Sequence, residues 1–181
     1  MSRMTKRAAV RDDQGCFDAA VRYLGYRPRS EAEIRQRLVM RGFESDGIER
    51  TVARLKEQGL VDDLAFARFW KENRESFRPR SQRLTRLELR RKGLDAETIE
   101  AVVAEIDDGD SAYRAALSRA PRLAGADYAG FRRRLGQYLR ERGFGYEVIN
   151  RTVARLWREY HESPGQPPVS AVAGQLSINH K

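Results

Sequence analysis

Arginine is the residue type in this sequence whose number and spacing best suit a chemical task, the binding of an anionic partner. Between positions 80 and 92 a single acidic residue, Glu88, accompanies six basic residues, which are Arg80, Arg83, Arg86, Arg90, Arg91 and Lys92. Arg80, Arg83 and Arg86 are about one helical turn apart, so one helix face can present all three to phosphates or carboxylates. These three are the first candidates for contact with a partner.

A second basic cluster lies between positions 132 and 142. It holds one acid, Glu141, and five arginines, which are Arg132, Arg133, Arg134, Arg140 and Arg142. Three consecutive arginines cannot all face one way on a helix, so at least one of them is solvated or structural. The predicted contact residues are Arg27, Arg29, Arg78, Arg80, Arg83, Arg86, Arg90, Arg91, Lys92, Arg132, Arg133 and Arg140.

An ordinary solvated helix face with i,i+4 ion pairs is the alternative interpretation of these arginines. The small number of acids near each cluster weighs against it without excluding it. An arginine surface also suits an acidic protein groove as well as it suits DNA, because guanidinium groups bind carboxylates and phosphates alike.

Residues suited to catalysis or metal binding are sparse. His161 and His180 are the two histidines and Cys16 is the one cysteine, too few for an ordinary zinc site or a histidine-based triad. Neighbouring carboxylates such as Asp62 and Asp63 could hold magnesium, but helix capping is the simpler interpretation. The sequence therefore predicts no enzyme, no metal and no cofactor.

Composition favours a polyanionic partner. The 181 residues include 35 Lys and Arg against 26 Asp and Glu, a net charge of +9 with a pI near 10.1. Such a balance is typical of proteins that contact nucleic acid, an anionic membrane surface or a nucleoprotein. The single cysteine, the absence of a secretory signal and the lack of a long apolar run predict a cytoplasmic protein with no membrane span.

The elements that must position these arginines repeat along the chain. Residues 26–30, Tyr-Arg-Pro-Arg-Ser, return 51 positions later as Phe-Arg-Pro-Arg-Ser at 77–81, and the Arg-Gly-Phe of 41–43 returns at 142–144. A period of about 50 residues indicates stacked units. We expect an all-α protein of three tandem three-helix repeats, stacked without right angles into an elongated, curved, solenoid-like molecule.

Hydrophobic spacing and capping signals place the helices of each repeat. Ser30 and Glu33 form a capping-box pattern before the second helix of repeat 1, and Gly42 ends that helix. The predicted helices are 16–25, 31–41 and 45–58 in repeat 1; from Asp62 or Asp63, 80–92 and 96–107 in repeat 2; and 111–119, a helix ending at 142, and 146–160 in repeat 3, with 121–126 irregular. Phe66, Phe69, Trp70 and Phe77 form an aromatic stripe, of which we assign Phe66, Phe69 and Trp70 to core packing.

These elements define the predicted domains. They are a flexible basic N-terminus at 1–14, repeat 1 at 15–61, repeat 2 at 62–107, repeat 3 at 108–160 and a disordered tail at 161–181. Stacking would align the second helices of the repeats and join their arginines into a basic stripe.

With these residues laid out, the chain resembles the RecX family of bacterial regulatory proteins, which act on the recombinase RecA. The resemblance spans about residues 16–160 and rests on the order of several short stretches. They include the Gly-Leu-Val-Asp-Asp of 59–63 with Phe66, the Glu-Leu of 88–89 with the Lys-Gly-Leu of 92–94, and the Arg-Gly-Phe of 142–144 with Tyr146 and Ile149. Thr85 departs from the pattern, because Ile34 and Leu135 hold the equivalent positions, and the second helix of repeat 2 could be rotated as a result.

The resemblance implies a curved molecule that lodges in the groove of the RecA filament on DNA. It further implies inhibition of the recombinase, ATPase and coprotease activities, and with it modulation of homologous recombination, DNA repair and the SOS response. Separately, we expect a monomer that binds bare single- or double-stranded DNA more weakly and in a salt-dependent way. The alternatives are a general basic DNA-binding protein that competes for DNA, and a helical adaptor for an acidic protein.

Overall fold

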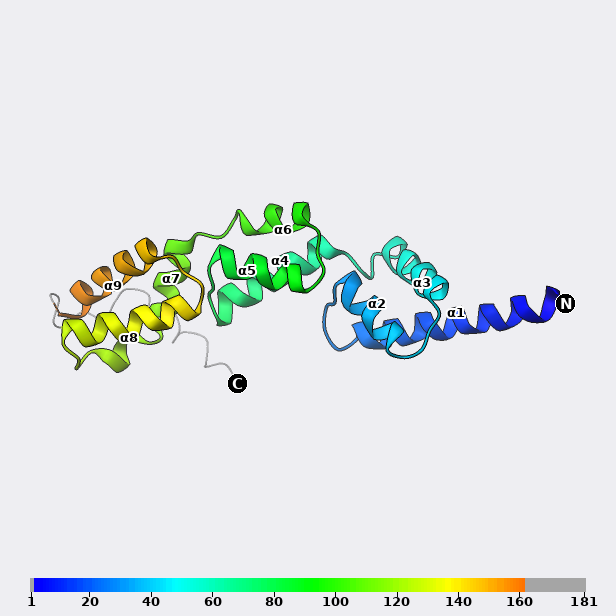
Figure 1. Ribbon diagram of the computed structural model, residues 1–181, viewed down its shortest axis with the longest axis horizontal. Coiled ribbons are helices and arrows are strands. Elements are labelled where there is room, and N and C mark those ends of the chain that lie inside the picture. Colours follow the sequence, from blue (N-terminus) through cyan, green and yellow to red (C-terminus); the bar gives the residue numbers. More distant parts are fainter. Residues whose placement is uncertain (1, 162–181) are drawn as a thin grey trace, which may run out of the picture. The chain divides into compact units, whose positions relative to one another are not determined.

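The computed structural model describes residues 2–161, and every regular element in that range is helical (Figure 1). The helices are α1 (Ser2–Leu24), α2 (Glu31–Val39) and α3 (Ser45–Glu57) in repeat 1; α4 (Asp63–Phe77), α5 (Gln82–Arg91) and α6 (Ala96–Val103) in repeat 2; and α7 (Asp108–Leu117), the 3₁₀ turn η1 (Ala120–Leu123), α8 (Tyr128–Glu141) and α9 (Tyr146–His161) in repeat 3. The predicted all-α class with tandem three-helix repeats is confirmed. The predicted tail beyond His161 lies outside the described residues.

Two compact units make up the chain. One comprises Met1–Ser76 with Thr85–Glu105, and the other comprises Phe77–Leu84 with Ile106–Lys181. The second unit therefore takes in the linker and first residues of α5 together with repeat 3. The repeat boundaries at 61–62 and 107–108 remain sequence predictions.

Apolar side chains at three- and four-residue spacing build the core of repeat 1. Ile34 and Leu38 of α2 are fully buried, as the periodicity predicted. The cluster consists of Cys16, Ala19, Ala20, Ile34, Leu38, Ile48, Val52, Leu55 and Val61. Val21 is 39% exposed, because the buried face of α1 runs through Cys16, Ala19 and Ala20.

Thr85 takes the inward position on α5 that Ile34 takes on α2. Its residue surface is 1% exposed, and Leu89, one turn later, is fully buried. The helix therefore keeps the register of the other second helices, and the rotation that Thr85 suggested does not occur.

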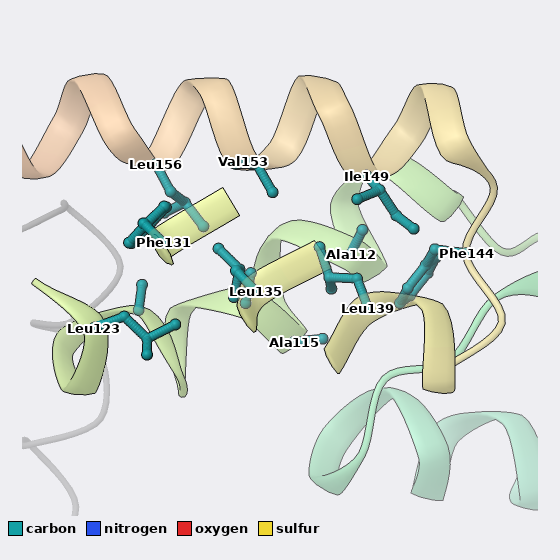
Figure 2. Close-up of a cluster of buried hydrophobic side chains, with 12 residues drawn as sticks. Ala112, Ala115, Leu123, Phe131, Leu135, Leu139, Phe144, Ile149, Val153 and Leu156 are labelled. Carbon is teal, nitrogen blue, oxygen red and sulfur yellow. The ribbon is translucent and has the colours of Figure 1, made fainter. Parts of the chain in front are cut away.

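A larger cluster fills repeat 3 (Figure 2). Phe131, Leu135 and Leu139 of α8 lie at four-residue spacing and meet Ile149, Val153 and Leu156 of α9, as Figure 2 shows. Alanines of α7 close the other side, and their small size lets the helices approach.

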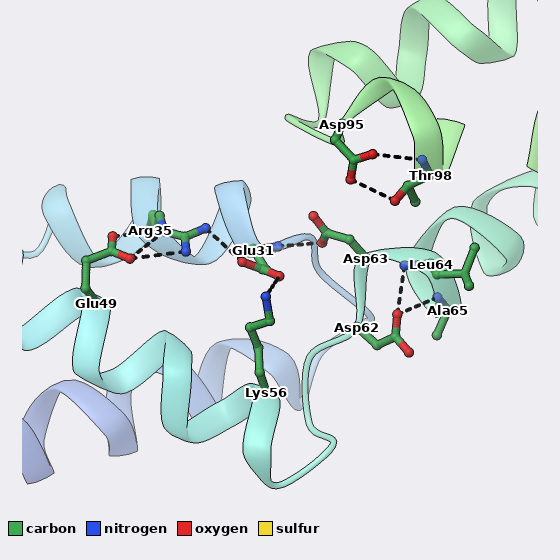
Figure 3. A network of polar contacts seen from close by, with 10 residues as sticks. All are labelled: Glu31, Arg35, Glu49, Lys56, Asp62, Asp63, Leu64, Ala65, Asp95 and Thr98. Carbon is green, nitrogen blue, oxygen red and sulfur yellow. Dashed lines mark hydrogen bonds and ion pairs between the residues drawn. The ribbon is translucent and has the colours of Figure 1, made fainter. Parts of the chain in front are cut away.

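Side-chain caps set the helix starts as the sequence predicted. Ser30 accepts a hydrogen bond from the Glu33 amide in a complete capping box, and Asp62 accepts from the Leu64 and Ala65 amides. Figure 3 shows Asp62 and also Asp95, which accepts from the Thr98 amide and hydroxyl. Each carboxylate satisfies amide donors that the first turn of a helix leaves unpaired.

Several helix ends differ from the prediction. The helix start predicted near Cys16 is wrong, because α1 begins at Ser2; no proline precedes Cys16 and the residues there are good helix formers. Helix α6 ends at Val103, short of the predicted 107, because Asp107 is the cap of α7. The predicted irregular segment 121–126 overlaps η1 (Ala120–Leu123). Whether residues 1–14 are flexible remains a prediction.

The predicted core packing of the aromatic side chains on α4 is wrong for Phe69. Phe66 is 2% exposed and packs at a tilt against Trp70, but Phe69 is 38% and Phe77 is 79% exposed. Phe77 is the last residue of α4, where the chain leaves the helix for the proline linker. Among the described residues, no helix is both long enough and apolar enough to cross a lipid bilayer.

Candidate anion-binding surface

An open cleft of about 690 Å³ lies along α8 and α9 and carries the densest group of predicted contact residues. The structure brings together Arg132, Arg133 and Arg140, which the sequence assigned to the second basic cluster. Its lining is Ala129, Arg132, Arg133, Gly136, Gln137, Arg140, Glu141, Tyr146, Ile149 and Asn150. Glu141 is the one acid in that lining, and it accepts a hydrogen bond from Gln137 at 3.2 Å.

Helical spacing explains why these side chains share a face. Arg132, Gly136 and Arg140 are four residues apart on α8, so they follow one another along one side of the helix. Gly136 is buried, and a Cβ there would lie 3.5 Å from Cγ2 of Ile149. The small floor residue keeps the cleft open between arginines that are all exposed.

Tyr146 adds an aromatic ring at the start of α9. The residue is 70% exposed. A hydrogen bond with Asn150, and secondly the positive charge of Arg132, lower the pKa of its phenol from the usual 10.0. The smaller part of this pKa shift, which comes from the charge of Arg132, reflects a positive potential that would also favour a bound phosphate or carboxylate.

Sequence reasoning missed Tyr146, Asn150 and Gly136 as parts of this surface. The signal for Gly136 was present, because a glycine inside a helical pattern costs stability and often marks a close approach. Tyr146 and Asn150 carried no comparable signal, since their place beside Arg132 depends on how α9 packs on α8.

The first basic cluster is organised differently from the prediction. Helix α5 begins at Gln82, so Arg80 lies in the preceding linker and the three arginines do not share one helix face. Arg86 binds Glu100 of α6 through two hydrogen bonds of 2.6 and 2.9 Å. Few acids lie near Arg86 in the sequence, but its acidic partner, Glu100, comes from the next helix rather than from the same segment.

Three further predicted contact residues have internal partners. Arg27 donates to Glu33 at 2.9 Å, and Lys92 reaches the same carboxylate at 2.6 Å. The guanidinium of Arg29 lies 4.0 Å above the ring of Tyr23. These contacts give Arg27, Arg29 and Lys92 a structural role, whatever else they bind.

The remaining candidates are exposed or half-buried and stay predictions as contact residues. Arg80 is half-buried. Those with exposed side chains are Arg78, Arg83, Arg90 and Arg91. Arg134, the third of the consecutive arginines, is exposed but does not line the cleft.

Carboxylates among the described residues accept hydrogen bonds from backbone amides at the starts of helices. Asp107 accepts from the Gly109 and Asp110 amides and caps α7, while Asp108 accepts from the Gln82 amide at 2.7 Å. Within residues 2–161, no group of three or more His, Cys, Asp or Glu side chains is placed to hold a metal ion.

Comparison with known proteins identifies the family. The pattern described as "RecX, first three-helix domain" matches residues 16–55, and that of "RecX, second three-helix domain" matches 62–103. The Regulatory protein RecX of Chlorobium phaeobacteroides (strain BS1) is 33% identical over 147 residues, which are 81% of this chain and 97% of the relative. The chain belongs to the RecX family.

Other RecX relatives support this assignment. The Regulatory protein RecX of Mycobacterium sp. (strain JLS) is 37% identical over 135 residues, covering 71% of this chain and 74% of its own length. The crystal structure of RecX from Lactobacillus salivarius superposes with a TM-score of 0.70 at 22% identity, over 81% of this chain and 97% of that chain. A match over 81% of this chain is longer than residues 1–103, so the shared fold extends into repeat 3.

Proposed function

We propose that this RecX protein regulates RecA by binding the RecA–DNA filament and inhibiting its recombinase, ATPase and coprotease activities. By this activity it modulates homologous recombination, DNA repair and the SOS response in the bacterial cytoplasm. Membership in a family of regulatory proteins carries the proposal. The cleft of α8 and α9, with three arginines against one acid, supports it as a surface for an anionic partner.

The mechanism we propose is restraint of the filament. A protein of tandem repeats can contact successive protomers of a polymer, and bridging them opposes the movements that accompany nucleotide turnover. Exposed arginines, including Arg83 and Arg90 on α5, would contact phosphates or acidic side chains. We expect the protein to act as a monomer and to bind bare single- or double-stranded DNA more weakly, with an affinity that falls as salt rises.

Titration of the purified protein into RecA-dependent ATPase and strand-exchange assays tests this proposal. Binding to bare DNA is measured beside them at the same ionic strength. Both reactions should slow at concentrations that leave bare DNA largely unbound. Equal affinity for bare and RecA-coated DNA would instead indicate a general DNA-binding protein that competes for DNA.

The role of the cleft is tested by charge reversal. Arg132→Glu with Arg140→Glu removes two lining cations, and Arg122→Glu with Arg158→Glu makes the same change of net charge at exposed sites outside this cleft. The cleft variant should lose filament binding, and its salt slope should fall by about one to two units of log Kd per log salt if two phosphate contacts are lost. Equal losses in both variants would mean that net charge, rather than this cleft, governs binding.

A further inference from the structure

Equivalent residues hold successive repeats together at two places, with the serine hydroxyl as the donor in one and the serine amide as the donor in the other. In the first, the Ser30 hydroxyl donates to the Lys92 carbonyl at 2.6 Å, directly before Gly93. In the second, the Ser81 amide donates to the Arg142 carbonyl at 3.1 Å, directly before Gly143. Ser30 and Ser81 are equivalent positions in the repeat, and both glycines end a second helix. We call this arrangement the inter-repeat joint.

A second contact accompanies each joint. In each joint the backbone amide of the residue after the serine donates to the side-chain carboxylate that begins the first helix of the next repeat. Glu31 donates to Asp63 at 2.9 Å, and Gln82 donates to Asp108 at 2.7 Å. Figure 3 shows the Glu31–Asp63 contact. The N-terminus of one repeat's second helix thus sits on the next repeat, and the pattern is the same in two copies of different sequence.

The glycine of each joint has no room for a side chain. A Cβ on Gly93 would collide with the Cβ of Ala32, and one on Gly143 would lie 2.8 Å from the Cβ of Leu84. Both glycines also have a positive φ, 82° and 89°, which other residues rarely adopt. The glycine is therefore the receiving side of the joint, and the serine-capped helix is the inserted side.

Repeat 1 has the same receiving side, and no helix of residues 2–161 is inserted in it. Gly42 ends α2 with φ 83°, as Gly93 and Gly143 end the equivalent helices. No atom of the described residues lies within 4 Å of a Cβ placed on Gly42. Beside this turn Val39 is 63% and Met40 is 71% exposed, whereas the equivalent residues of repeat 2 are Arg90 and Arg91.

We infer that the turn formed by Val39, Met40, Arg41 and Gly42 is a vacant inter-repeat joint that receives a helix N-terminus of a partner protein. Both occupied joints insert a helix with a serine N-cap, and the side chain after the cap that meets the glycine is Ala32 in the first and Leu84 in the second. We therefore expect the partner helix to have a serine or threonine N-cap and an apolar residue two or three positions later. Val39 and Met40 would contact an apolar side chain of the partner, because their exposed apolar surface lies beside the turn. The inference rests on the proposed function, because it takes that partner to be a RecA protomer.

A second copy of this chain is a poor occupant. Its two serine-capped helices, beginning after Ser30 and Ser81, are already inserted in joints of their own. The second helix of repeat 3 begins at Asp127, an aspartate cap that accepts from the Gly130 amide. Repeat 3 therefore offers no hydroxyl cap to the turn of another molecule.

Asparagine substitution at two matched glycines tests the inference. Gly42 and Gly59 both follow helices of repeat 1 with positive φ, and around both the described residues leave open space. Asparagine tolerates this backbone conformation better than other side chains, so Gly42→Asn and Gly59→Asn should unfold at similar denaturant concentrations. Kd for RecA filaments on single-stranded DNA is then measured by co-sedimentation.

Gly42→Asn should raise Kd about ten- to hundredfold, the range expected when an extra side chain is forced into a packed contact, whereas Gly59→Asn should leave it within about twofold. Met40→Ser should also weaken binding, and Met40→Leu should not. Equal Kd values for the two asparagine variants would show that the turn at Gly42 does not bind the filament, and the proposed function would still stand. If the wild-type protein does not bind the filament, both the proposed function and the vacant joint are wrong. If the wild-type protein self-associates and Gly42→Asn abolishes that association, the occupant of the joint is a second copy of this chain and not a RecA helix.

Discussion

The inter-repeat joint makes a strong prediction about stability, namely that Gly93→Ala costs much more than Gly59→Ala. Both glycines have a positive φ, 82° and 67°, so each alanine pays a similar backbone strain of about 1–2 kcal/mol. The new methyl group at position 59 meets open space among the described residues, but at position 93 it collides with Ala32.

The difference between the two variants isolates the joint. Overpacking a well-packed contact costs about 1–3 kcal/mol. Gly93→Ala should therefore lower the free energy of unfolding by about 2–5 kcal/mol, and Gly59→Ala by about 1–2 kcal/mol. Urea unfolding followed by circular dichroism at 222 nm measures both, and the m value checks that the surface exposed on unfolding is unchanged.

A double-mutant cycle completes the test. Ala32→Gly removes the methyl group that Gly93→Ala strikes, at a cost in helix propensity of up to about 1 kcal/mol by itself. Combined with Gly93→Ala it should recover most of the excess loss, giving a coupling energy of about 1–3 kcal/mol. If Gly93→Ala and Gly59→Ala differ by less than about 0.5 kcal/mol, or if the coupling is absent, Ala32 does not pack on Gly93 and the joint as described is wrong.

Three further predictions concern other parts of the fold. Phe131→Ala should destabilise repeat 3 by about 3–5 kcal/mol in urea unfolding, because Phe131 is fully buried, and a loss below about 1 kcal/mol would contradict the packing of Figure 2. Burial alone would raise the pKa of Glu33, but hydrogen bonds from its two cationic partners outweigh it and leave the pKa below 4.5. The stabilisation that ionised Glu33 contributes is therefore present above the unfolded-state pKa and is lost as pH falls through the folded-state pKa. Glu33→Gln should lower the melting temperature at pH 7, and the variant should approach the wild type in acid. A difference in melting temperature that does not change with pH would refute this. Phe77→Ser should leave the free energy of unfolding within about 0.5 kcal/mol, because the residue is 79% exposed, and a larger loss would show that the ring is covered.

Local signals in the sequence predicted most of the helices. Ser30, Asp62 and Asp95 cap the helices they were expected to cap, since a cap depends only on the three or four residues that follow it. The limits of helices without a strong signal were less predictable. Helix α1 extends to Ser2 because nothing in that segment breaks a helix.

The candidate surface was predictable only in part. Arg132, Arg133 and Arg140 meet in one cleft, as their spacing on one helix allowed. Arg86 was misjudged because its partner, Glu100, lies on another helix, and Tyr146 was missed because its neighbours come from α8. Pairings between helices depend on packing, and the spacing of residues within one helix does not contain them.

By itself the sequence determined the repeat, the helical class, the excess of positive charge and the resemblance to the RecX family, because each of these is a property of residue types at fixed intervals. Tertiary structure alone decided which arginines are paired and which aromatic rings are exposed. It also decided that, within the part of the chain that the structure describes, the turn at Gly42 lacks the neighbour found at Gly93 and Gly143. The physical reason is distance in the chain: Ser30 meets Lys92, and Ser81 meets Arg142, across some sixty residues, so these contacts exist only once the repeats have packed.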